Sequence, residues 1–350
     1  MGVNSHTVGI KTDKTCIAIG LNDNNQCNIT EWKNIKQVDC GGSHTVGLKT
    51  DGTCIAVGNN SKGQCNVENW KDIAIVYCGD RYTIGLKRNG ACIAVGDNAY
   101  GQCNVQDWAN IVQVACGSCH TVGLKADGTC VCVGDNSKKQ CNVTDWKDIV
   151  QVSCGAYHTV GMKKDGTCVA VGMNIDKQCN ITDWKDIKQI SGGYAHTIGL
   201  KNNGTCVAIG LNTDKQCNIT DWKNIVQVSC GYYNSVGLES NGTCIAVGSN
   251  SYGQCNVTGC NNIKSLMSDY ILLTLPKFLL DKGSQYYTIK DNELVSLENQ
   301  TLDKSNFINN GFEDLNLLTQ NNESYNITKK SNNNIFEFDL NNDMKKIEVM

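Results

Sequence analysis

The sequence predicts an all-β fold: a closed seven-bladed β-propeller of 38-residue repeats, followed by a small C-terminal α+β module. Three observations lead to this prediction. The same residues recur at a constant interval in seven copies, each copy reads as four short strands, and glycine is abundant (35) whereas proline is nearly absent (1). Much glycine with little proline is typical of many tight turns that join short strands.

Four sets of residues carry the repeat, and within each set the members lie 38 positions apart. The first set is mainly histidine, the second and third are cysteine, and the fourth is mainly tryptophan. No copy contains an insertion, so the units are equal building blocks. The sets are His6, His44, Tyr82, His120, His158, His196 and Asn234; Cys16, Cys54, Cys92, Cys130, Cys168, Cys206 and Cys244; Cys27, Cys65, Cys103, Cys141, Cys179, Cys217 and Cys255; and Trp32, Trp70, Trp108, Trp146, Trp184, Trp222 and Cys260.

The third unit illustrates the four strands that we expect in each blade. Ile73–Cys78 and Tyr82–Lys87 are the first two, and the turn 88–90 leads into the third, Ala91–Gly96. This turn contains Asn-Gly, which favours a hairpin because both residues accept a positive φ. A polar loop then reaches a short outer strand, Gln102–Val105. Four strands in about 40 residues is the pattern of a propeller blade.

The two ends of the repeat region predict how the ring closes. The chain starts in the second strand of its first unit, and Ile263–Met267 continues the register of a first strand after the seventh unit. We expect Ile263–Met267 to pair beside Ser5–Lys11 and to close the first blade, which removes two unpaired edges. The propeller is therefore assigned to residues 1–268 and a small docking module to residues 269–350.

The C-terminal module is expected to combine short strands with one helix. The helix is Thr301–Asn310, ended by Gly311, because glycine is a common stop signal. The strands are expected at Lys277–Asp281, Gln285–Lys290, Glu293–Leu297, Ser324–Lys329 and Asn334–Leu340.

Two resemblances to known families bear on context. The string HTVGLKTDGTCIAVGNNSKGQCNV resembles the regulator of chromosome condensation repeat in its compact bacterial form, and the likeness covers residues 3–268. The eukaryotic founder of that family is a nuclear exchange factor for a small GTPase and a nucleosome binder, but its basic tail and blade insertion have no counterpart here. The C-terminal part is similar to accessory modules of clostridial phage tail and surface proteins, and the Asn- and Lys-rich composition is similar to that of clostridia.

The net charge and the N-terminal residues bear on the kind of partner and on where the protein is made. The formal net charge is −3 with a pI near 6.0, which argues against a nucleic-acid partner. The start MGVNSHTVGIKTD has no basic segment and no apolar core, and no apolar run is long enough to span a membrane. We expect synthesis in the cytoplasm without a signal peptide, and the phage resemblance favours a place in a virion.

Cysteine, histidine and tryptophan each allow a structural and a functional interpretation. The 22 cysteines suit small buried side chains better than zinc ligands or disulfides, because only Cys116 and Cys119 have a Cys-x-x-Cys spacing. The histidine set would make a metal-binding ring, but Tyr82 and Asn234 interrupt it, so we favour hydrogen bonds within each blade. The tryptophans are expected to pack between blades, with a sugar-stacking belt as the alternative.

Motifs of catalysis are not found in the sequence. It contains no Gly-x-Ser-x-Gly, no His-Glu-x-x-His and no phosphate-binding loop, and its paired carboxylates belong to the repeat. We therefore predict that the protein is not an enzyme and that it carries neither a cofactor nor a metal ion.

One face of the ring varies from unit to unit and is the candidate binding surface. The turns between the second and third strands and the links between blades are nearly constant, whereas the loops of the opposite face differ. Tyrosine is frequent among the variable residues, and it offers a broad contact area with a polar group. The alternative is neutral drift on a solvated surface. The candidate ligand-binding residues are Arg81, Tyr100, Tyr157, Tyr194, Tyr232, Tyr233 and Tyr252.

Two functions of different classes fit these observations. The first is a non-enzymatic recognition protein, such as a part of a phage tail or tail fibre, that binds a host surface polysaccharide or protein; the C-terminal module would dock it to other tail components. The second is a cytoplasmic scaffold that regulates another protein through one propeller face. Neither involves nucleic acid or a membrane.

Overall fold

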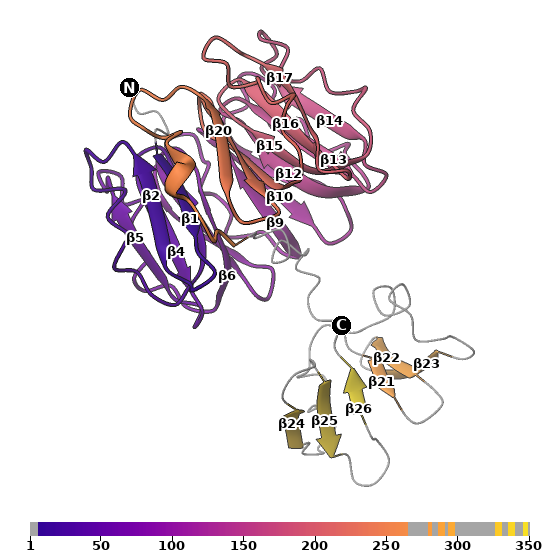
Figure 1. Cartoon of the computed structure of the whole chain (residues 1–350). Helices are drawn as coiled ribbons and strands as arrows, with labels where there is room; N and C mark the ends of the chain where they lie inside the picture. Colours follow the sequence, from indigo (N-terminus) through magenta and orange to yellow (C-terminus); the bar gives the residue numbers. More distant parts are fainter. Residues whose placement is uncertain are drawn as a thin grey trace. The chain divides into compact units, whose positions relative to one another are not determined.

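The computed structural model describes residues 6–264 and six short strands beyond them, and the chain divides into two units, Met1–Leu272 and Leu273–Met350. The first unit is the propeller (Figure 1). In the part of the chain that the structure describes, no helix has the length and hydropathy needed to cross a membrane.

The propeller consists of seven small antiparallel sheets, which confirms the predicted seven-bladed fold. We number the blades 1 to 7 along the chain. Blade 1 has two strands, and each of the other six has three, with the middle strand between its sequence neighbours. The strands are β1 (His6–Ile10) and β2 (Cys16–Gly20); β3 (Ile35–Cys40), β4 (His44–Lys49) and β5 (Cys54–Gly58); β6 (Ile73–Cys78), β7 (Tyr82–Lys87) and β8 (Cys92–Gly96); β9 (Ile111–Cys116), β10 (His120–Lys125) and β11 (Cys130–Gly134); β12 (Ile149–Cys154), β13 (His158–Lys163) and β14 (Cys168–Gly172); β15 (Ile187–Gly192), β16 (His196–Lys201) and β17 (Cys206–Gly210); β18 (Ile225–Cys230), β19 (Asn234–Glu239) and β20 (Cys244–Gly248).

The predicted outer strand Gln102–Val105 is wrong, because this segment is a series of turns. Its backbone groups find other partners: the amide of Val105 donates to the carbonyl of Cys103, and the carbonyl of Gln102 accepts from the Thr121 hydroxyl of the next blade at 2.7 Å. Gln102 and Val105 are both buried. The segment therefore fastens one blade to the next instead of adding a fourth strand.

Indole rings pack between successive blades, as predicted. The ring of Trp70, from the link that precedes blade 3, lies so close to Gly85 of β7 that a Cβ there would be 2.7 Å from its Cζ3. Equivalent contacts join the other tryptophans to Gly47, Gly123, Gly161, Gly199 and Gly237. Trp32, Trp70, Trp146 and Trp222 are less than a tenth exposed, so the alternative of a sugar-stacking belt is wrong.

Blade 1 receives its third strand position from the far end of the ring. Lys11 and Ile263 form an antiparallel bridge, the amide of Lys264 donates to the carbonyl of Ile10 at 2.8 Å, and the amide of Thr12 donates to the carbonyl of Asn262 at 2.9 Å. Of the predicted closing strand, residues 265–267 lie outside the described part of the chain. A short 3₁₀ helix, η1 (Val257–Gly259), precedes the closing contact.

In the second unit, the described strands form one antiparallel sheet in the order β23-β22-β21-β26-β25-β24. The predicted strands agree with five of these, and the sixth, β26, was not predicted. The predicted helix Thr301–Asn310 lies outside the described residues. The strands are β21 (Leu279–Asp281), β22 (Tyr286–Lys290), β23 (Glu293–Leu297), β24 (Asn326–Lys330), β25 (Ile335–Asp339) and β26 (Lys346–Glu348).

Candidate functional site

The first strands of blades 2 to 7 line a central channel, and their side chains hydrogen-bond the first strand of the next blade beside them. Gln37 is a clear example: its Nε2 donates to the carbonyl of Val76 at 2.8 Å, and its Oε1 accepts from the amide of Val76 at 2.9 Å. Gln189 holds Val228 in the same way. Because a first strand has no further strand beside it in its blade, these amides occupy backbone groups that would otherwise be unpaired.

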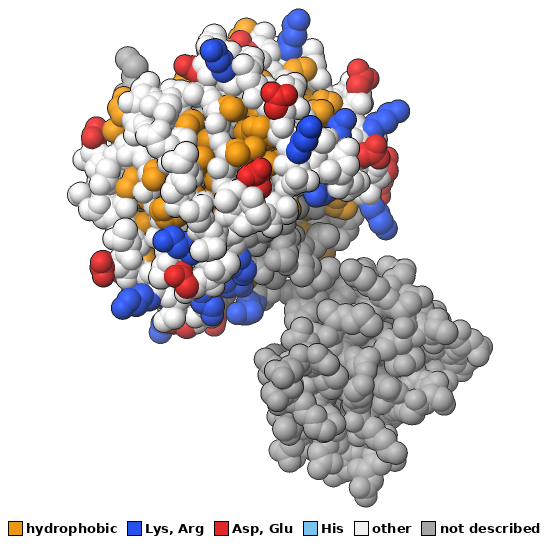
Figure 2. Space-filling model, viewed as in Figure 1, with side chains coloured by type: hydrophobic (Ala, Val, Ile, Leu, Met, Phe, Trp, Pro, Cys, Tyr) orange, Lys and Arg blue, Asp and Glu red, His pale blue; other side chains and the backbone are white. Residues whose placement is uncertain are grey.

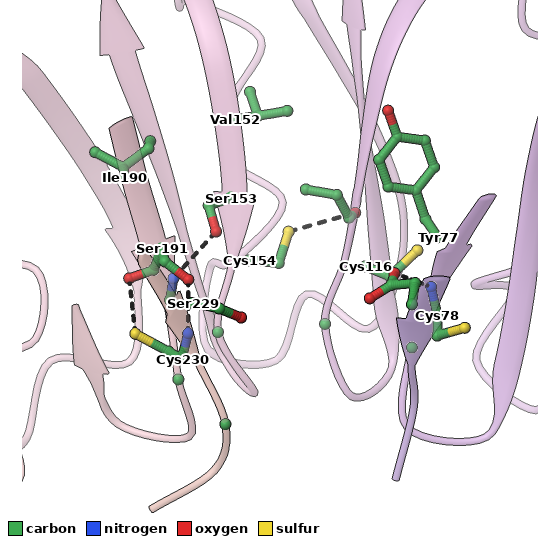
Figure 3. Close-up of a pocket in the computed structure, with 18 of the residues that line it drawn as sticks. Tyr77, Cys78, Cys116, Val152, Ser153, Cys154, Ile190, Ser191, Ser229 and Cys230 are labelled. Carbon is green, nitrogen blue, oxygen red and sulfur yellow. Dashed lines mark hydrogen bonds between the residues drawn. The ribbon is translucent and has the colours of Figure 1, made fainter. Parts of the chain in front are cut away.

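A second layer of side chains, two residues further along, repeats this bracing. The hydroxyl oxygen of Ser153 accepts from the amide of Gly192, and that of Ser191 accepts from the amide of Cys230, each at 3.0 Å (Figure 3). In blade 2 the position is Asp39, whose carboxylate accepts from the amides of Cys78 and Cys40. Burial raises the pKa of Asp39 to about 6, although both amide bonds oppose that shift.

Between these strands lies a cavity of about 210 Å³. Its walls are formed by residues of blades 2 to 7, among them serine, glutamine and cysteine, and Figure 3 shows Ser153, Ser191 and Ser229 on neighbouring strands. Tyr77 of β6 takes the position that serine has in blades 5 to 7, and it contributes to the lining on the side of blade 3.

The loops that join the first and second strands form one mouth of the channel and hydrogen-bond to each other around it. The amide of Gly42 donates to the carbonyl of Asp80 at 2.9 Å, and that of Tyr194 donates to the carbonyl of Tyr232 at 3.2 Å. The amide of Ser118 similarly donates to the carbonyl of Ala156 at 3.2 Å. This network fixes the variable loops on a rigid frame.

Four tyrosines of these loops form a continuous cluster, which we call the tyrosine rim: Tyr157, Tyr194, Tyr232 and Tyr233. The ring of Tyr194 lies at its centre, with centroids 6.0 Å from Tyr157, 5.5 Å from Tyr232 and 5.3 Å from Tyr233. Edge-to-face packing at these distances holds aromatic rings in place. All four side chains are half-buried, so the rim presents ring surface to solvent while its members support one another.

Tyr232 reaches from blade 7 across the mouth of the channel. Its hydroxyl lies 2.9 Å from the Oγ of Ser118 in blade 4 and also hydrogen-bonds Asp80 of blade 3. Burial, together with the carboxylate of Asp80, raises the pKa of Tyr232 far above its usual range. Burial also raises the pKa of Asp80, although the guanidinium of Arg81 opposes this, with its Nε 3.7 Å from the carboxylate.

The structure thus brings together four of the seven predicted binding residues. Arg81 lies beside Asp80 at the same mouth, and its side chain is 56% exposed. Tyr100 and Tyr252 are 61% and 51% exposed on the loops that follow the third strands, and neither makes a ring contact within the described residues. Asp80 and Ser118 were not predicted as site residues, although both lie in variable loops; no sequence signal places them beneath a tyrosine from the opposite blades.

On the face of the propeller that Figure 2 shows, basic and acidic side chains lie among apolar and polar surface. At the channel mouth, the carboxylate of Asp80 and the guanidinium of Arg81 lie beside each other.

Comparison with known proteins agrees with this architecture. The family model for the Regulator of chromosome condensation (RCC1) repeat matches residues 35–64, 111–140, 149–178, 187–216 and 225–254. The propeller thus contains RCC1-type repeats. No curated protein sequence is significantly similar to this RCC1-type propeller.

Several solved structures share the fold. The CRINKLY WD40 ectodomain of the Arabidopsis thaliana receptor kinase ACR4 has a TM-score of 0.62 at 16% identity, over 72% of this chain and 94% of that one. The ectodomain of the Physcomitrella patens receptor kinase CR4 has 0.60 at 18% identity, over 71% of each chain. Prp20p from Saccharomyces cerevisiae has 0.58 at 15% identity, over 74% and 84%. At these identities the likeness shows the fold alone.

The histidines of the RCC1-type propeller are structural, but their partners differ from the prediction. Each bonds the next blade and not its own: His44 Nε2 lies 3.0 Å from the Oγ1 of Thr83, and His120 Nε2 lies 2.9 Å from that of Thr159. Both histidines are fully buried, and burial lowers the pKa of His44 to about 3 and that of His120 to about 4. Buried neutral imidazoles of this kind serve as braces between blades.

Two of the cysteines are joined in a disulfide. Cys132 and Cys141 form a disulfide with a Cα–Cα distance of 5.3 Å, and the other 20 cysteines are free. In the other blades the position of Cys132 is alanine, so only blade 4 can form this pair. Among the described residues, no three side chains of histidine, cysteine, aspartate or glutamate could hold a metal ion together.

Proposed function

We propose that this RCC1-type propeller is a non-enzymatic recognition protein that binds a polysaccharide at a host cell surface through the tyrosine rim. The observation that carries the proposal is the rim itself: four mutually packed tyrosines on the loops that vary between blades, held by a frame that hardly varies. Rigid aromatic side chains lose little conformational entropy on binding and offer both an apolar face and a hydroxyl.

The composition of the mouth favours a polysaccharide over a protein. Tyrosine ring faces can cover the C–H faces of sugars, while Ser118 and the Tyr232 hydroxyl offer hydrogen bonds. The large exposed hydrophobic residues, Tyr100, Ile175 and Tyr252, lie on loops after the third strands and not in the rim. The rim is thus a small polar-aromatic surface, whereas stable protein interfaces bury about 800 Å² per partner.

A place in a phage tail or tail fibre is the setting that we propose for this activity. Its support is the similarity of the C-terminal sequence to accessory modules of clostridial phage tail and surface proteins. The fold does not choose between settings, because the same architecture can serve unrelated functions. Mass spectrometry of purified phage particles tests the setting directly: a tail protein is present in them.

The alternative is a cytoplasmic scaffold that regulates another protein through the same face. Its test is affinity purification of the tagged chain from its own host. A stoichiometric intracellular partner, together with absence from purified particles, would favour the scaffold.

Binding of the fluorescently labelled protein to intact Gram-positive cells tests the recognition itself. The test variant changes Tyr157, Tyr194 and Tyr232 to Ser, and the matched control changes Tyr100 and Tyr252 to Ser outside the rim. Thermal melting verifies that both variants are folded. We expect wild type and control to decorate cells and the rim variant to lose binding. Loss of binding after protease treatment of the cells would instead identify a protein receptor, and failure of wild type on every strain contradicts the proposal.

A further inference from the structure

The channel under Tyr232 has hydrogen-bond donors that no described residue uses. Ser153 accepts an amide hydrogen with its oxygen and donates its hydroxyl hydrogen to no other described residue, whereas Ser191 accepts an amide hydrogen and also hydrogen-bonds the thiol of Cys230. Ser229, at the same level of the next strand, is exposed to the channel (Figure 3). Three serine hydroxyls on consecutive blades thus line one side of the cavity.

The lining of the cavity also contains hydrogen-bond acceptors, but it contains no cationic side chain among the described residues. Asp39 and Asp80 contribute carboxylates to the lining, and the described lining contains no lysine, arginine or histidine. An anionic ligand would lack a counter-charge there and would meet two carboxylates. A free amine would leave the serine donors unused. A neutral polyhydroxy compound matches the walls best, since each of its hydroxyls can both donate and accept.

The size of the cavity suits one sugar ring. Its volume is about 210 Å³, and a second cavity of about 200 Å³ shares Asp39, Cys40 and Ser229 with it, so the space continues towards blade 1. The terminal residue of a glycan fits the part beside the serines, with its remainder at the mouth.

Tyr232 controls the entrance. Its side chain spans the mouth, hydrogen-bonded to Ser118 and Asp80 at one side and packed on Tyr194 at the other. In this position it belongs both to the wall of the cavity and to the rim. A ligand that enters past it would turn Tyr232 aside and replace its hydrogen bonds.

We infer that the channel is an inner subsite for a single neutral sugar residue and that Tyr232 is its gate. The inference rests on the proposed function and makes it specific: the tyrosine rim contacts the body of a glycan, and the serine side of the channel binds its non-reducing end.

The repeat itself supplies the variants for a test. Blade 3 has Tyr77 and blade 4 has Ala115 at the position of Ser229. Ser229→Tyr therefore fills the cavity with a side chain that this channel already accommodates, and Ser229→Ala removes only the hydroxyl. The Ser229 hydroxyl braces no described backbone group, so both changes spare the ring.

The experiment uses the full chain and a panel of neutral monosaccharides: glucose, galactose, mannose, rhamnose, N-acetylglucosamine and N-acetylgalactosamine. Saturation-transfer NMR measures their binding. We expect at least one to bind wild type with a Kd on the order of 1 mM, a free energy within reach of a few hydrogen bonds. Ser229→Tyr should abolish this binding, and Ser229→Ala should weaken it several-fold. Tyr157→Ser, a rim change remote from the serines, should leave it unchanged.

The role of Tyr232 as a gate is tested separately, by the association rate of the sugar. This test does not depend on Ser229→Tyr being folded. Tyr232→Phe keeps the ring and removes both hydrogen bonds, so the sugar should associate faster than with wild type; Tyr194→Phe is the control.

Three results overturn the inference: no saturable binding of any panel sugar, equal binding by Ser229→Tyr, or an unchanged association rate in Tyr232→Phe. If Ser229→Tyr still decorates cells as wild type does, the inner subsite is wrong and the proposed recognition by the rim stands. If wild type decorates no cells, the proposed function has failed regardless of the sugar result.

Discussion

The Nε2 of His44 lies 3.0 Å from the Oγ1 of Thr83 in the next blade, and that same Oγ1 donates to the carbonyl of Gln64 at 2.8 Å. Because the threonine hydrogen goes to the carbonyl, the histidine must donate its Nε2 hydrogen to the threonine oxygen. One hydroxyl therefore ties together three segments from two blades. The arrangement recurs at the four other histidines; Tyr82 takes the place of histidine in blade 3 and Asn234 in blade 7.

Thr83→Val should therefore destabilise the protein more than Thr7→Val. Thr83 is fully buried and its loss leaves both His44 and the Gln64 carbonyl without a partner, which costs about 1–3 kcal/mol per unsatisfied group. Thr7 donates to the carbonyl of Gln254 but has no histidine partner and is only half-buried. Denaturant unfolding of both variants measures the difference, and equal losses would show that the histidine bond contributes nothing.

Stability should fall as the pH drops from 7 towards 4. Burial lowers the pKa of His44 and His158 to about 3, and that of His6, His120 and His196 to about 4. Between these values and about 6.5 only the unfolded chain binds the protons, so each histidine removes up to about 1.4 kcal/mol per pH unit. Asp39 and Asp80 act in the opposite direction, because burial raises the pKa of each in the folded state, but they are two groups against five.

One substitution tests whether the histidines cause the loss of stability at low pH, and the repeat itself suggests which residue to introduce. His158→Asn copies Asn234 and should reduce the slope of unfolding free energy against pH by up to about 1.4 kcal/mol per pH unit, the contribution of one of five comparable histidines. The measurement is urea unfolding at a series of pH values between 4.5 and 7. A slope unaffected by the substitution would assign the acid sensitivity to other groups.

The sequence predicts the strands well where the repeat controls them. Two strands of the third unit, β6 and β7, agree in both bounds, because β6 is a short apolar run and the Asn-Gly turn 89–90 marks the end of β7. The segment 102–105 has the same apolar pattern but follows a different rule: Val105 is buried against the next blade, and the Gln102 carbonyl is bound by Thr121. Contacts between blades decide its conformation, and they have no local signature.

The sequence predicts the residues of the candidate site better than it predicts their contacts. Comparison of units singles out Tyr157, Tyr194 and Tyr232 because they depart from the repeat. The contact of Tyr232 with Ser118 joins residues 114 positions apart and depends on how far a tyrosine reaches across a closed ring. Such a distance follows from the radius of the channel, which a repeat pattern does not give.

Gly85→Ala should be strongly destabilising, and Gly9→Ala should be close to neutral. A Cβ at Gly85 would lie 2.7 Å from the Trp70 ring, and overpacking of this kind costs about 1–3 kcal/mol. At Gly9, the seventh place of the tryptophan set is Cys260, and the nearest atom is the tip of Ile263 at 3.3 Å, which can turn away. Thermal melting compares the two, and similar melting temperatures would mean that the Trp–Gly contacts yield easily.

Thiol counting tests the pair in blade 4. Of the 22 cysteines, 20 should react with Ellman's reagent after unfolding without a reductant, because Cys132 and Cys141 are joined. Cys132→Ala copies the alanine of the other blades and releases Cys141, so the count should rise to 21 although one cysteine has been removed. A count of 22 in the wild type would show that the pair is reduced in the purified protein.

Removal of the closing segment should open the ring. A chain that ends at Asn261 loses the bridge between Lys11 and Ile263 and the hydrogen bond from Lys264 to Ile10, which leaves β1 with an unpaired edge. Exposed edges promote aggregation, so this chain should lose cooperative unfolding and associate in solution. A chain that ends at Leu272 retains the whole first unit and is the control. Light scattering and thermal melting distinguish the two, and a cooperative monomer from the shorter chain would place ring closure elsewhere.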